Sequence, residues 1–193
     1  IHDQLVERIV ALTEKLTIGD PTERTVFMGP VINKNSYKDF QDFCAELKQA
    51  GRLLTGGKVL TDGDFSKGYF VTPTLFADVP YSHRLWKIEM FLPITTIGKI
   101  KTLEEGMQIA NDVDYGLTSG FYGTDEEAQW FFDNIEAGVN YANRPQGATT
   151  GAWPGFQPFG GWKGSGATGK NAGGHHYLQM YMREQVYNQV KKI

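Results

Sequence analysis

Two helix-start signals set among β-branched segments constrain the fold more than any other feature of the chain. Thr102 is followed three residues later by Glu105, and Thr124 is followed in the same way by Glu127. A threonine and a glutamate at this spacing can form a capping box, in which each side chain satisfies a backbone N–H at the helix start. The expected strands around these helices are 94–100, 116–122 and 139–142. Strand, helix, strand, helix and strand predict parallel strands with helical crossovers, and therefore an α/β fold.

The remaining elements are expected from apolar periodicity and from chain breakers. Leu5, Ile9, Leu12 and Leu16 recur at helical spacing and predict an amphipathic helix over 3–17, ended by a Gly-Asp-Pro sequence. Because this stripe begins so near the first residue, we expect the helix to continue a longer polypeptide. The other expected elements are a helix over 35–50, extended segments at 53–54, 58–60 and 70–76, a short helix over 175–182 and a last extended segment over 184–190.

Charge and composition exclude several classes of function. The net charge of −3 over 193 residues gives no general basic surface for nucleic acid or for an anionic membrane. The chain contains no apolar run near the roughly 20 residues that a membrane-spanning helix needs. A metal site is not expected either, because the four histidines lack ligand spacing to cysteine or carboxylate partners. They are His2, His83, His175 and His176.

Cys44 is the one cysteine, and it has to be weighed as a nucleophile. It shares an apolar helical face with Phe40, Phe43 and Leu47, where cysteine behaves as a small hydrophobic residue. No histidine lies near it in sequence to lower the pKa of its thiol. We therefore expect a structural role for Cys44, and a single thiol is consistent with a reducing compartment.

A second apparent motif is a near match to the phosphate-binding loop of nucleotide triphosphatases. The run from Gly164 to Asn171 fits G-x-x-x-x-G-K-[ST] at every position except the last, where Asn171 has no hydroxyl for Mg²⁺. The segment 157–163 before it is not the buried hydrophobic strand that such a loop follows. We therefore reject the nucleotide triphosphatase reading.

A series of short motifs, spread over essentially the whole chain, points to one family. Glu89-Met90-Phe91-Leu92-Pro93 is similar to a Glu-x-Phe-Gly-Pro motif, and residues 158–166 are similar to a Pro-Phe-Gly-Gly-x-Lys-x-Ser-Gly block. The supporting pieces are Gly29-Pro30-Val31, Gly68-Tyr69-Phe70, Pro73-Thr74-Leu75-Phe76, Ala110-Asn111, Tyr115-Gly116-Leu117, Ala137-Gly138-Val139 and Asn143. In this order the motifs resemble the C-terminal part of the aldehyde dehydrogenase superfamily, closest to its 1-pyrroline-5-carboxylate (glutamate semialdehyde) dehydrogenase branch.

The resemblance implies NAD(P)-dependent oxidation of an aldehyde. In that chemistry a thiolate attacks the aldehyde, hydride passes to NAD or NADP, and water hydrolyses the resulting thioester. The motif carboxylate and aromatic fall on Glu89 and Phe91, which implies that Glu89 holds the nicotinamide ribose and Phe91 packs near the nicotinamide. The alternative, which composition alone favours, is that Glu89 is simply a charged residue at the solvent-exposed edge of a strand. The motif departs from the family at Leu92, where glycine is usual; if that position requires a positive φ, leucine costs about 1–2 kcal/mol there.

The resemblance also implies what this chain does not carry. The family's nucleophilic cysteine, its general-base glutamate and most of its dinucleotide-binding fold precede the part matched here. We therefore expect no catalytic residue in this chain, and we expect an N-terminal aldehyde dehydrogenase portion bearing the cysteine as its partner. The isolated chain is expected to be inactive.

The substrate is expected to meet the segment from Thr150 to Phe159. This stretch resembles the substrate-anchoring loop of the glutamate semialdehyde branch, where backbone amides hold a carboxylate, and the corresponding residues are Gly151 and Ala152, with Phe159 as a wall of the site. Consecutive N–H groups at glycine can form an anion nest. A Gly/Pro loop with no ligand is the simpler alternative.

These readings combine into one expected organisation. Residues 1–182 should form most of an aldehyde dehydrogenase catalytic domain, and 183–193 an oligomerisation strand and tail that makes a homo- or hetero-oligomer. We expect oxidation of a carboxylated semialdehyde in the cytoplasm, or in the mitochondrial matrix of a eukaryote. A non-catalytic structural or regulatory subunit, and a dehydrogenase for another aldehyde, are the alternatives.

Overall fold

Residues 1–145, 157–166 and 170–191 are described in the computed structural model, and they belong to two units. The first unit is Ile1–Lys101 and the second is Thr102–Ile193. The expected division after residue 182 stays a prediction.

The core of the first unit is built on α2 (Lys34–Ala50), the helix expected over 35–50. The side chain of Asn33 accepts a hydrogen bond from the backbone N–H of Ser36 and caps the helix. Phe40, Cys44 and Leu47 recur at helical spacing and are buried. The apolar face predicted for this helix is therefore confirmed.

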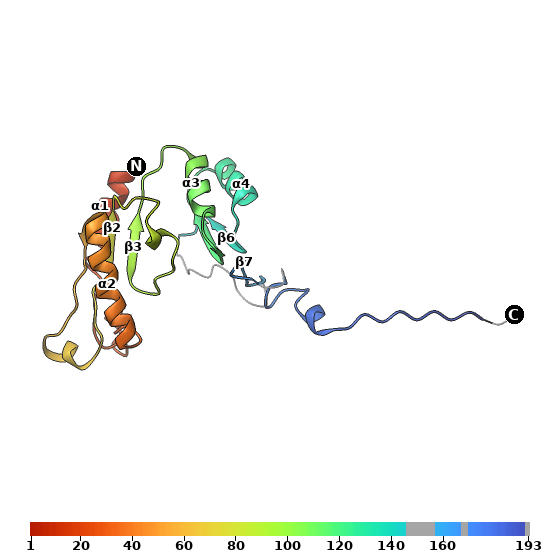
Figure 1. Cartoon of the computed structure of the whole chain (residues 1–193), viewed down its shortest axis with the longest axis horizontal. Coiled ribbons are helices and arrows are strands. Elements are labelled where there is room, and N and C mark those ends of the chain that lie inside the picture. Colours follow the sequence, from red (N-terminus) through yellow and green to blue (C-terminus); the bar gives the residue numbers. More distant parts are fainter. Residues whose placement is uncertain (146–156, 167–169, 192–193) are drawn as a thin grey trace. The chain divides into compact units, whose positions relative to one another are not determined.

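A three-stranded sheet packs against α2 (Figure 1). It contains β1 (Arg52–Thr55), β2 (Thr74–Ala77) and β3 (Ile94–Ile97) in that order, with β1 antiparallel and β3 parallel to β2. Every residue of the central strand β2 is buried. The expected segment at 58–60 forms only a single bridge, between Val59 and Val71. A short 3₁₀ turn, η1 (Gly63–Lys67), lies between β1 and β2 in the sequence.

The first helix, α1 (His2–Thr13), is shorter than expected and has no fully buried residue. Of its predicted stripe, Leu5 and Leu12 are exposed and Ile9 is half-buried. Leu16 is also half-buried, but it lies beyond the helix. The apolar side of α1 is therefore only partly covered by this chain.

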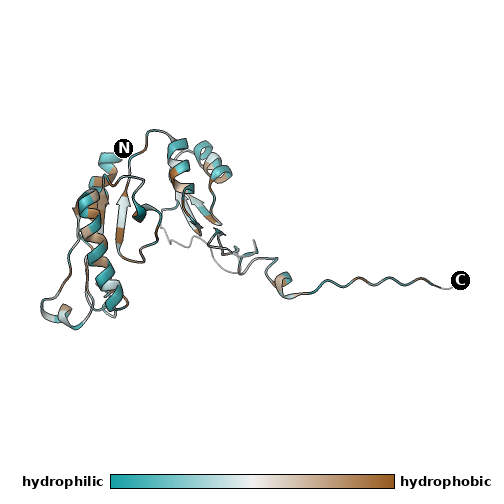
Figure 2. Cartoon of the chain, viewed as in Figure 1, coloured by the Kyte–Doolittle hydropathy of each residue, from teal (hydrophilic) through white to brown (hydrophobic). Residues whose placement is uncertain are grey.

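The second unit contains the βαβ crossover that the sequence predicts. β5 (Thr118–Phe121) and β6 (Val139–Ala142) are parallel neighbours, joined through α4 (Asp125–Asn134). Both halves of the predicted capping box of α4 are present, between Thr124 and Glu127. The preceding helix, α3 (Leu103–Asn111), begins with the backbone N–H of Glu105 donating to the Thr102 hydroxyl. Figure 2 shows both helices largely in hydrophilic colours, as expected for helices with a solvent face.

The strand expected over 116–122 is split in two. β4 (Tyr115–Gly116) pairs antiparallel with β7 (Trp162–Lys163), whereas β5 pairs with β6. Phe121 stacks on Phe131 of α4 with ring centroids 5.1 Å apart, at the edge of a small apolar core.

Asn143 ends β6 with a closed pair of hydrogen bonds. Its side chain accepts from the backbone N–H of Gly123 at 3.0 Å and donates to the carbonyl of Gly123 at 2.9 Å. The φ of Asn143 is +51°, a conformation that asparagine tolerates better than most residues. The end of the sheet is thus fixed at this residue.

The C-terminal residues contain less regular structure than expected. The helix expected over 175–182 is only a 3₁₀ turn, η3 (Leu178–Tyr181), none of whose residues is buried. Without a buried face, a short segment has little to stabilise a longer helix. The following residues, 182–191, run in an extended and exposed path (Figure 1).

Candidate functional site

The acidic and aromatic motif forms a loop immediately before β3 in the first unit. Its first residues are bound to the 3₁₀ turn η2 (Arg84–Trp86), because the backbone N–H groups of Lys87 and Ile88 donate to the Arg84 carbonyl at 3.0 and 3.1 Å. At its other end, the Pro93 carbonyl accepts at 2.9 Å from the N–H of Thr74, the first residue of the buried strand β2. Both ends of the loop are therefore fixed by backbone hydrogen bonds.

Alternate side chains of this loop point to the core and to solvent. Met90 and Leu92 pack against the first core, whereas Glu89 and Phe91 are exposed. The Phe91 ring is 85% exposed, and within the described part of the chain no side chain or backbone group pairs with the Glu89 carboxylate. The loop thus presents one carboxylate and one aromatic ring from neighbouring positions. A carboxylate accepts hydrogen bonds from hydroxyl groups, and an exposed ring can pack on a planar heterocycle.

The expected strain at Leu92 is corrected by the structure, because Leu92 is not among the described residues with positive φ. The positive φ, +53°, lies at Phe91 instead. Leu92 keeps ordinary backbone geometry, its side chain packs on the core, and its carbonyl accepts from Ile94 at 2.7 Å. For a bulky residue a positive φ is a genuine outlier, and such outliers concentrate at functional sites. This signal at Phe91 was not available from sequence.

The glycine-rich block lies in the second unit and is held by its lysine. The Lys163 ammonium donates to the carbonyls of Asn111 at 2.5 Å and Val113 at 3.3 Å, and it pairs with the Glu136 carboxylate at 2.6 Å. The Ser165 hydroxyl accepts from the backbone N–H of Gly116 at 3.1 Å. These motif residues connect the block to the end of α3 and to β4, a structural role that sequence reasoning did not assign.

Close backbone packing explains Gly166 of this block and Gly138, which lies against the block. A Cβ added at Gly138 would overlap the carbonyl oxygen of Gly160, and one added at Gly166 would overlap that of Gly161. Asn171, the failed position of the triphosphate motif, donates to the Gly160 carbonyl. Among the described residues of this segment, a two-residue antiparallel strand precedes Gly164, and no helix begins at 170–174. Neither feature matches a strand-to-helix phosphate loop.

The predicted substrate residues are described only in part. Phe159 is half-buried, and its backbone exchanges hydrogen bonds of 2.8 and 3.0 Å with Ala172. Gly151 and Ala152 lie outside the described residues. Their assignment therefore stays a prediction from sequence.

Cys44 lies inside the first core and is 3% exposed. Burial raises the pKa of its thiol to about 11, against weaker opposing effects of Lys48 and Thr74. Because the thiolate is the reactive form, this environment is the opposite of one that activates a nucleophile.

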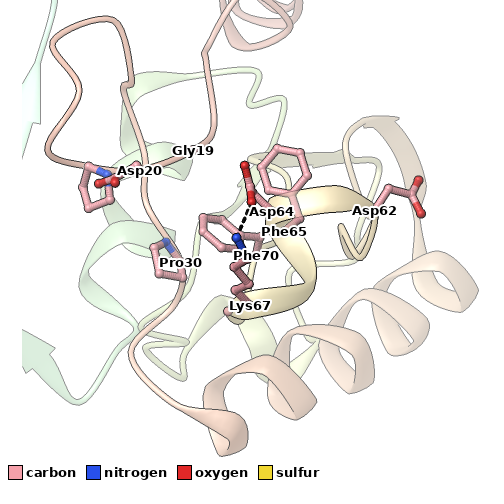
Figure 3. Close-up of a pocket in the computed structure, with 10 residues that line it drawn as sticks. Gly19, Asp20, Pro30, Asp62, Asp64, Phe65, Lys67 and Phe70 are labelled. Carbon is pink, nitrogen blue, oxygen red and sulfur yellow. Dashed lines mark hydrogen bonds and ion pairs between the residues drawn. The ribbon is translucent and has the colours of Figure 1, made fainter.

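A cavity of about 750 Å³ lies in the first unit (Figure 3). Phe65 and Phe70 form one wall, with ring centroids 5.1 Å apart. Three of its charged groups have protein partners: Asp64 pairs with Lys67 at 2.6 Å, and Asp20 accepts from Thr22. The residues that line it include neither Glu89 nor Phe91.

Two further features are absent from the part of the chain that the structure describes. No group of three or more histidine, cysteine, aspartate or glutamate side chains could hold a metal ion there. In the same residues, no helix has both the length and the apolar character needed to cross a membrane.

The arrangement of helices and strands places the chain in the α/β structural class. A parallel β2–β3 pair beside α2, and a β5–α4–β6 crossover, make both units α/β in construction. The α/β fold predicted from sequence is confirmed.

Comparison with known proteins then identifies the family. The model of the aldehyde dehydrogenase family matches residues 1–187, and the chain belongs to this family. A 1-pyrroline-5-carboxylate dehydrogenase of Geobacillus kaustophilus is 39% identical over 98% of this chain and 36% of its own length. The resemblance predicted from the motifs is therefore confirmed.

Solved structures agree with this assignment. The 1-pyrroline-5-carboxylate dehydrogenase from Thermus with bound NAD is 34% identical, with a TM-score of 0.81 over 91% of this chain and 33% of that one. An aldehyde dehydrogenase of Mycobacterium tuberculosis complexed with NAD⁺ is 29% identical, with a TM-score of 0.77 over 89% of this chain and 34% of that one. The chain thus spans about a third of the length of the relatives that it matches.

Proposed function

We propose that the chain contributes the Glu89–Phe91 cofactor loop to an NAD-dependent dehydrogenase that oxidises glutamate semialdehyde to glutamate. The observation that carries the cofactor role is the outward pair of Glu89 and Phe91 on a loop fixed at both ends. The names of the curated relatives support the substrate, and the two NAD-bound neighbours support NAD, with NADP as the alternative.

The loop residues have separate tasks in this proposal. The Glu89 carboxylate accepts hydrogen bonds from the ribose hydroxyls of the nicotinamide half. The exposed Phe91 ring packs beside the nicotinamide and limits its orientation. When bound, the cofactor supplies the hydride acceptor.

The nucleophile is proposed to come from a polypeptide portion other than this chain. Cys44 is the single cysteine, and its burial and raised pKa make it unsuitable. A partner portion bearing the reactive cysteine would complete the site. The alternative, a non-catalytic subunit, is separated from this proposal by intact-mass analysis of the purified particle. A second, cysteine-bearing polypeptide is expected there, whereas its absence from an inactive particle would favour the alternative.

Replacing Glu89 with glutamine should raise the KM for NAD⁺, or lower the hydride-transfer rate, about tenfold or more in the complete enzyme. Glutamine keeps the shape but loses the charge, so each hydrogen bond to the ribose loses its ionic component. Steady-state kinetics with NAD⁺ and aldehyde varied separately test this, and the KM for the aldehyde should stay nearly unchanged. Asp42→Asn, on the exposed side of α2, is the control and should alter neither. Equal losses for both substrates would instead indicate a collapsed site.

Deleting residues 184–193 should shift the enzyme to a smaller assembly. Val186 and Val190 are 92% and 88% exposed, and among the described residues the backbone of Glu184–Val190 makes no hydrogen bond. An extended segment with free backbone groups can add to a sheet of a neighbouring subunit. Light scattering of the deleted and complete proteins measures the change in mass. An unchanged mass would contradict the proposed oligomerisation role.

A further inference from the structure

The side chain of Arg84 connects the cofactor loop to helix α2. The Arg84 carbonyl accepts the N–H groups of Lys87 and Ile88, which are the first residues of the loop. Its guanidinium binds both oxygens of Glu46, with Nε 2.7 Å from Oε1 and an NH2 nitrogen on Oε2. One residue therefore contacts the loop through its backbone and the helix through its side chain.

Glu46 lies on a rigid element. Its neighbours on α2, Cys44 and Leu47, are buried in the first core, so the backbone around Glu46 has little freedom. The guanidinium of Arg84 also lies 5.5 Å from the centre of the Phe43 ring. The planar guanidinium fork matches a carboxylate in one orientation, so a two-point contact of this kind fixes direction more than a single charge does.

Glu46 and Arg84 are both charged at neutral pH. The hydrogen bond from Arg84 is the largest cause holding the pKa of the Glu46 carboxyl below its usual range. His83 also approaches Glu46, with its Nε2 3.4 Å from Oε1. Glu46 is thus the common partner of two consecutive residues at the start of η2.

Other contacts hold the turn itself in the fold. Leu85 is 2% exposed in the core, and the indole N–H of Trp86 donates to the Val79 carbonyl at 3.1 Å. Removing the Glu46–Arg84 pair should therefore leave the turn folded while freeing the orientation of the Arg84 peptide. An effect of these substitutions on the loop can therefore be distinguished from unfolding of the turn.

We propose that Glu46 and Arg84 are positioning residues that set the placement of Glu89 and Phe91 for the nicotinamide cofactor. The proposal rests on the cofactor role proposed above for that loop. It assigns a role in cofactor binding to two residues outside the motif.

The test compares Glu46→Gln and Arg84→Lys with Asp42→Asn in the complete enzyme. Asp42 pairs with Lys38 at 2.5 Å on the same helix, so its substitution removes a more exposed ion pair that does not touch the loop. Hydrogen exchange of the Lys87 and Ile88 amides should become about fivefold faster in Glu46→Gln, and the KM for NAD⁺ should rise about fivefold. The KM for the aldehyde should stay unchanged. Arg84→Lys should behave similarly, because a lysine lacks the fork, and Asp42→Asn should match the unaltered enzyme.

Glu89→Gln, measured beside these variants, separates the two proposals. If Glu89→Gln raises the KM for NAD⁺ but Glu46→Gln does not, the positioning role is overturned and the cofactor role stands. Unchanged exchange at Lys87 and Ile88 in Glu46→Gln would also overturn the positioning role. If Glu89→Gln leaves both the KM for NAD⁺ and the hydride-transfer rate unchanged, the proposed cofactor role fails, and the positioning role fails with it.

Discussion

Glutamate semialdehyde should be oxidised with a kcat/KM at least about a hundredfold higher than that of an uncharged aldehyde of the same length. The reason is the proposed contact between the substrate carboxylate and the backbone N–H groups of Gly151 and Ala152. Losing the partners of a charged group costs roughly 3 kcal/mol, which corresponds to a factor of more than a hundred. The measurement is made on the complete enzyme, because this chain spans only 36% of the length of the Geobacillus kaustophilus relative.

Replacing Gly151 with valine should remove most of this preference. A β-branched side chain at this position would block the close approach of a carboxylate to the backbone. Gln49→Ala, on the exposed side of α2, is the control, because Gln49 lies outside this segment and has no assigned role. Equal efficiency for the two aldehydes in the unaltered enzyme would rule out glutamate semialdehyde as the preferred substrate and leave only the family assignment.

The thiol of Cys44 should react about a hundredfold more slowly with iodoacetamide at pH 8 than an unperturbed thiol. The pKa is raised from 9.0 to about 11, and a difference of two units lowers the thiolate fraction about a hundredfold at this pH. Burial of the sulfur should slow the reaction further. Because the raised pKa belongs to the folded state, unfolding in guanidinium chloride should restore ordinary reactivity, and mass spectrometry follows the alkylation.

Substitution of Cys44 tests whether the nucleophile lies outside this chain. Cys44→Ala should leave NADH production by the complete enzyme unchanged, and the isolated 193-residue chain should produce none. Rapid alkylation of folded Cys44, or NADH formation by the isolated chain that Cys44→Ala abolishes, would show that Cys44 is the nucleophile.

Local sequence signals predicted those parts of the fold whose contacts are close in sequence. The capping box at Thr124 and the buried face of α2 follow from spacings of three and four residues, and both are present. The pairing of β3 with β2 was not predicted, because it joins segments about 20 residues apart through contacts that no local pattern records. The split of the expected strand at Leu117 has the same cause, since β4 and β5 pair with different partners.

The candidate site was predictable in its residues but not in its geometry. The motif identified Glu89 and Phe91, and the alternation with Met90 and Leu92 accounts for their exposure. The positive φ falls one residue before the position that comparison with the usual glycine suggested. Backbone dihedrals of a loop depend on how both of its ends are held, and here those ends are held by η2 and by the first residue of β2.

The hydrogen-bonded closure at Asn143 has a consequence for how this family can diversify. Because both polar groups of its side chain are bound to Gly123, Asn143, the residue that follows β6, is held by contacts with an earlier part of the chain. Lengthening a surface connection costs little conformational entropy, about 0.6 kcal/mol for each doubling. Insertions and deletions after Arg144 can therefore accumulate without disturbing the register of β6. Chimaeras of relatives joined just after Asn143 would show whether exchanging the segment that carries Gly151 also exchanges the preferred aldehyde.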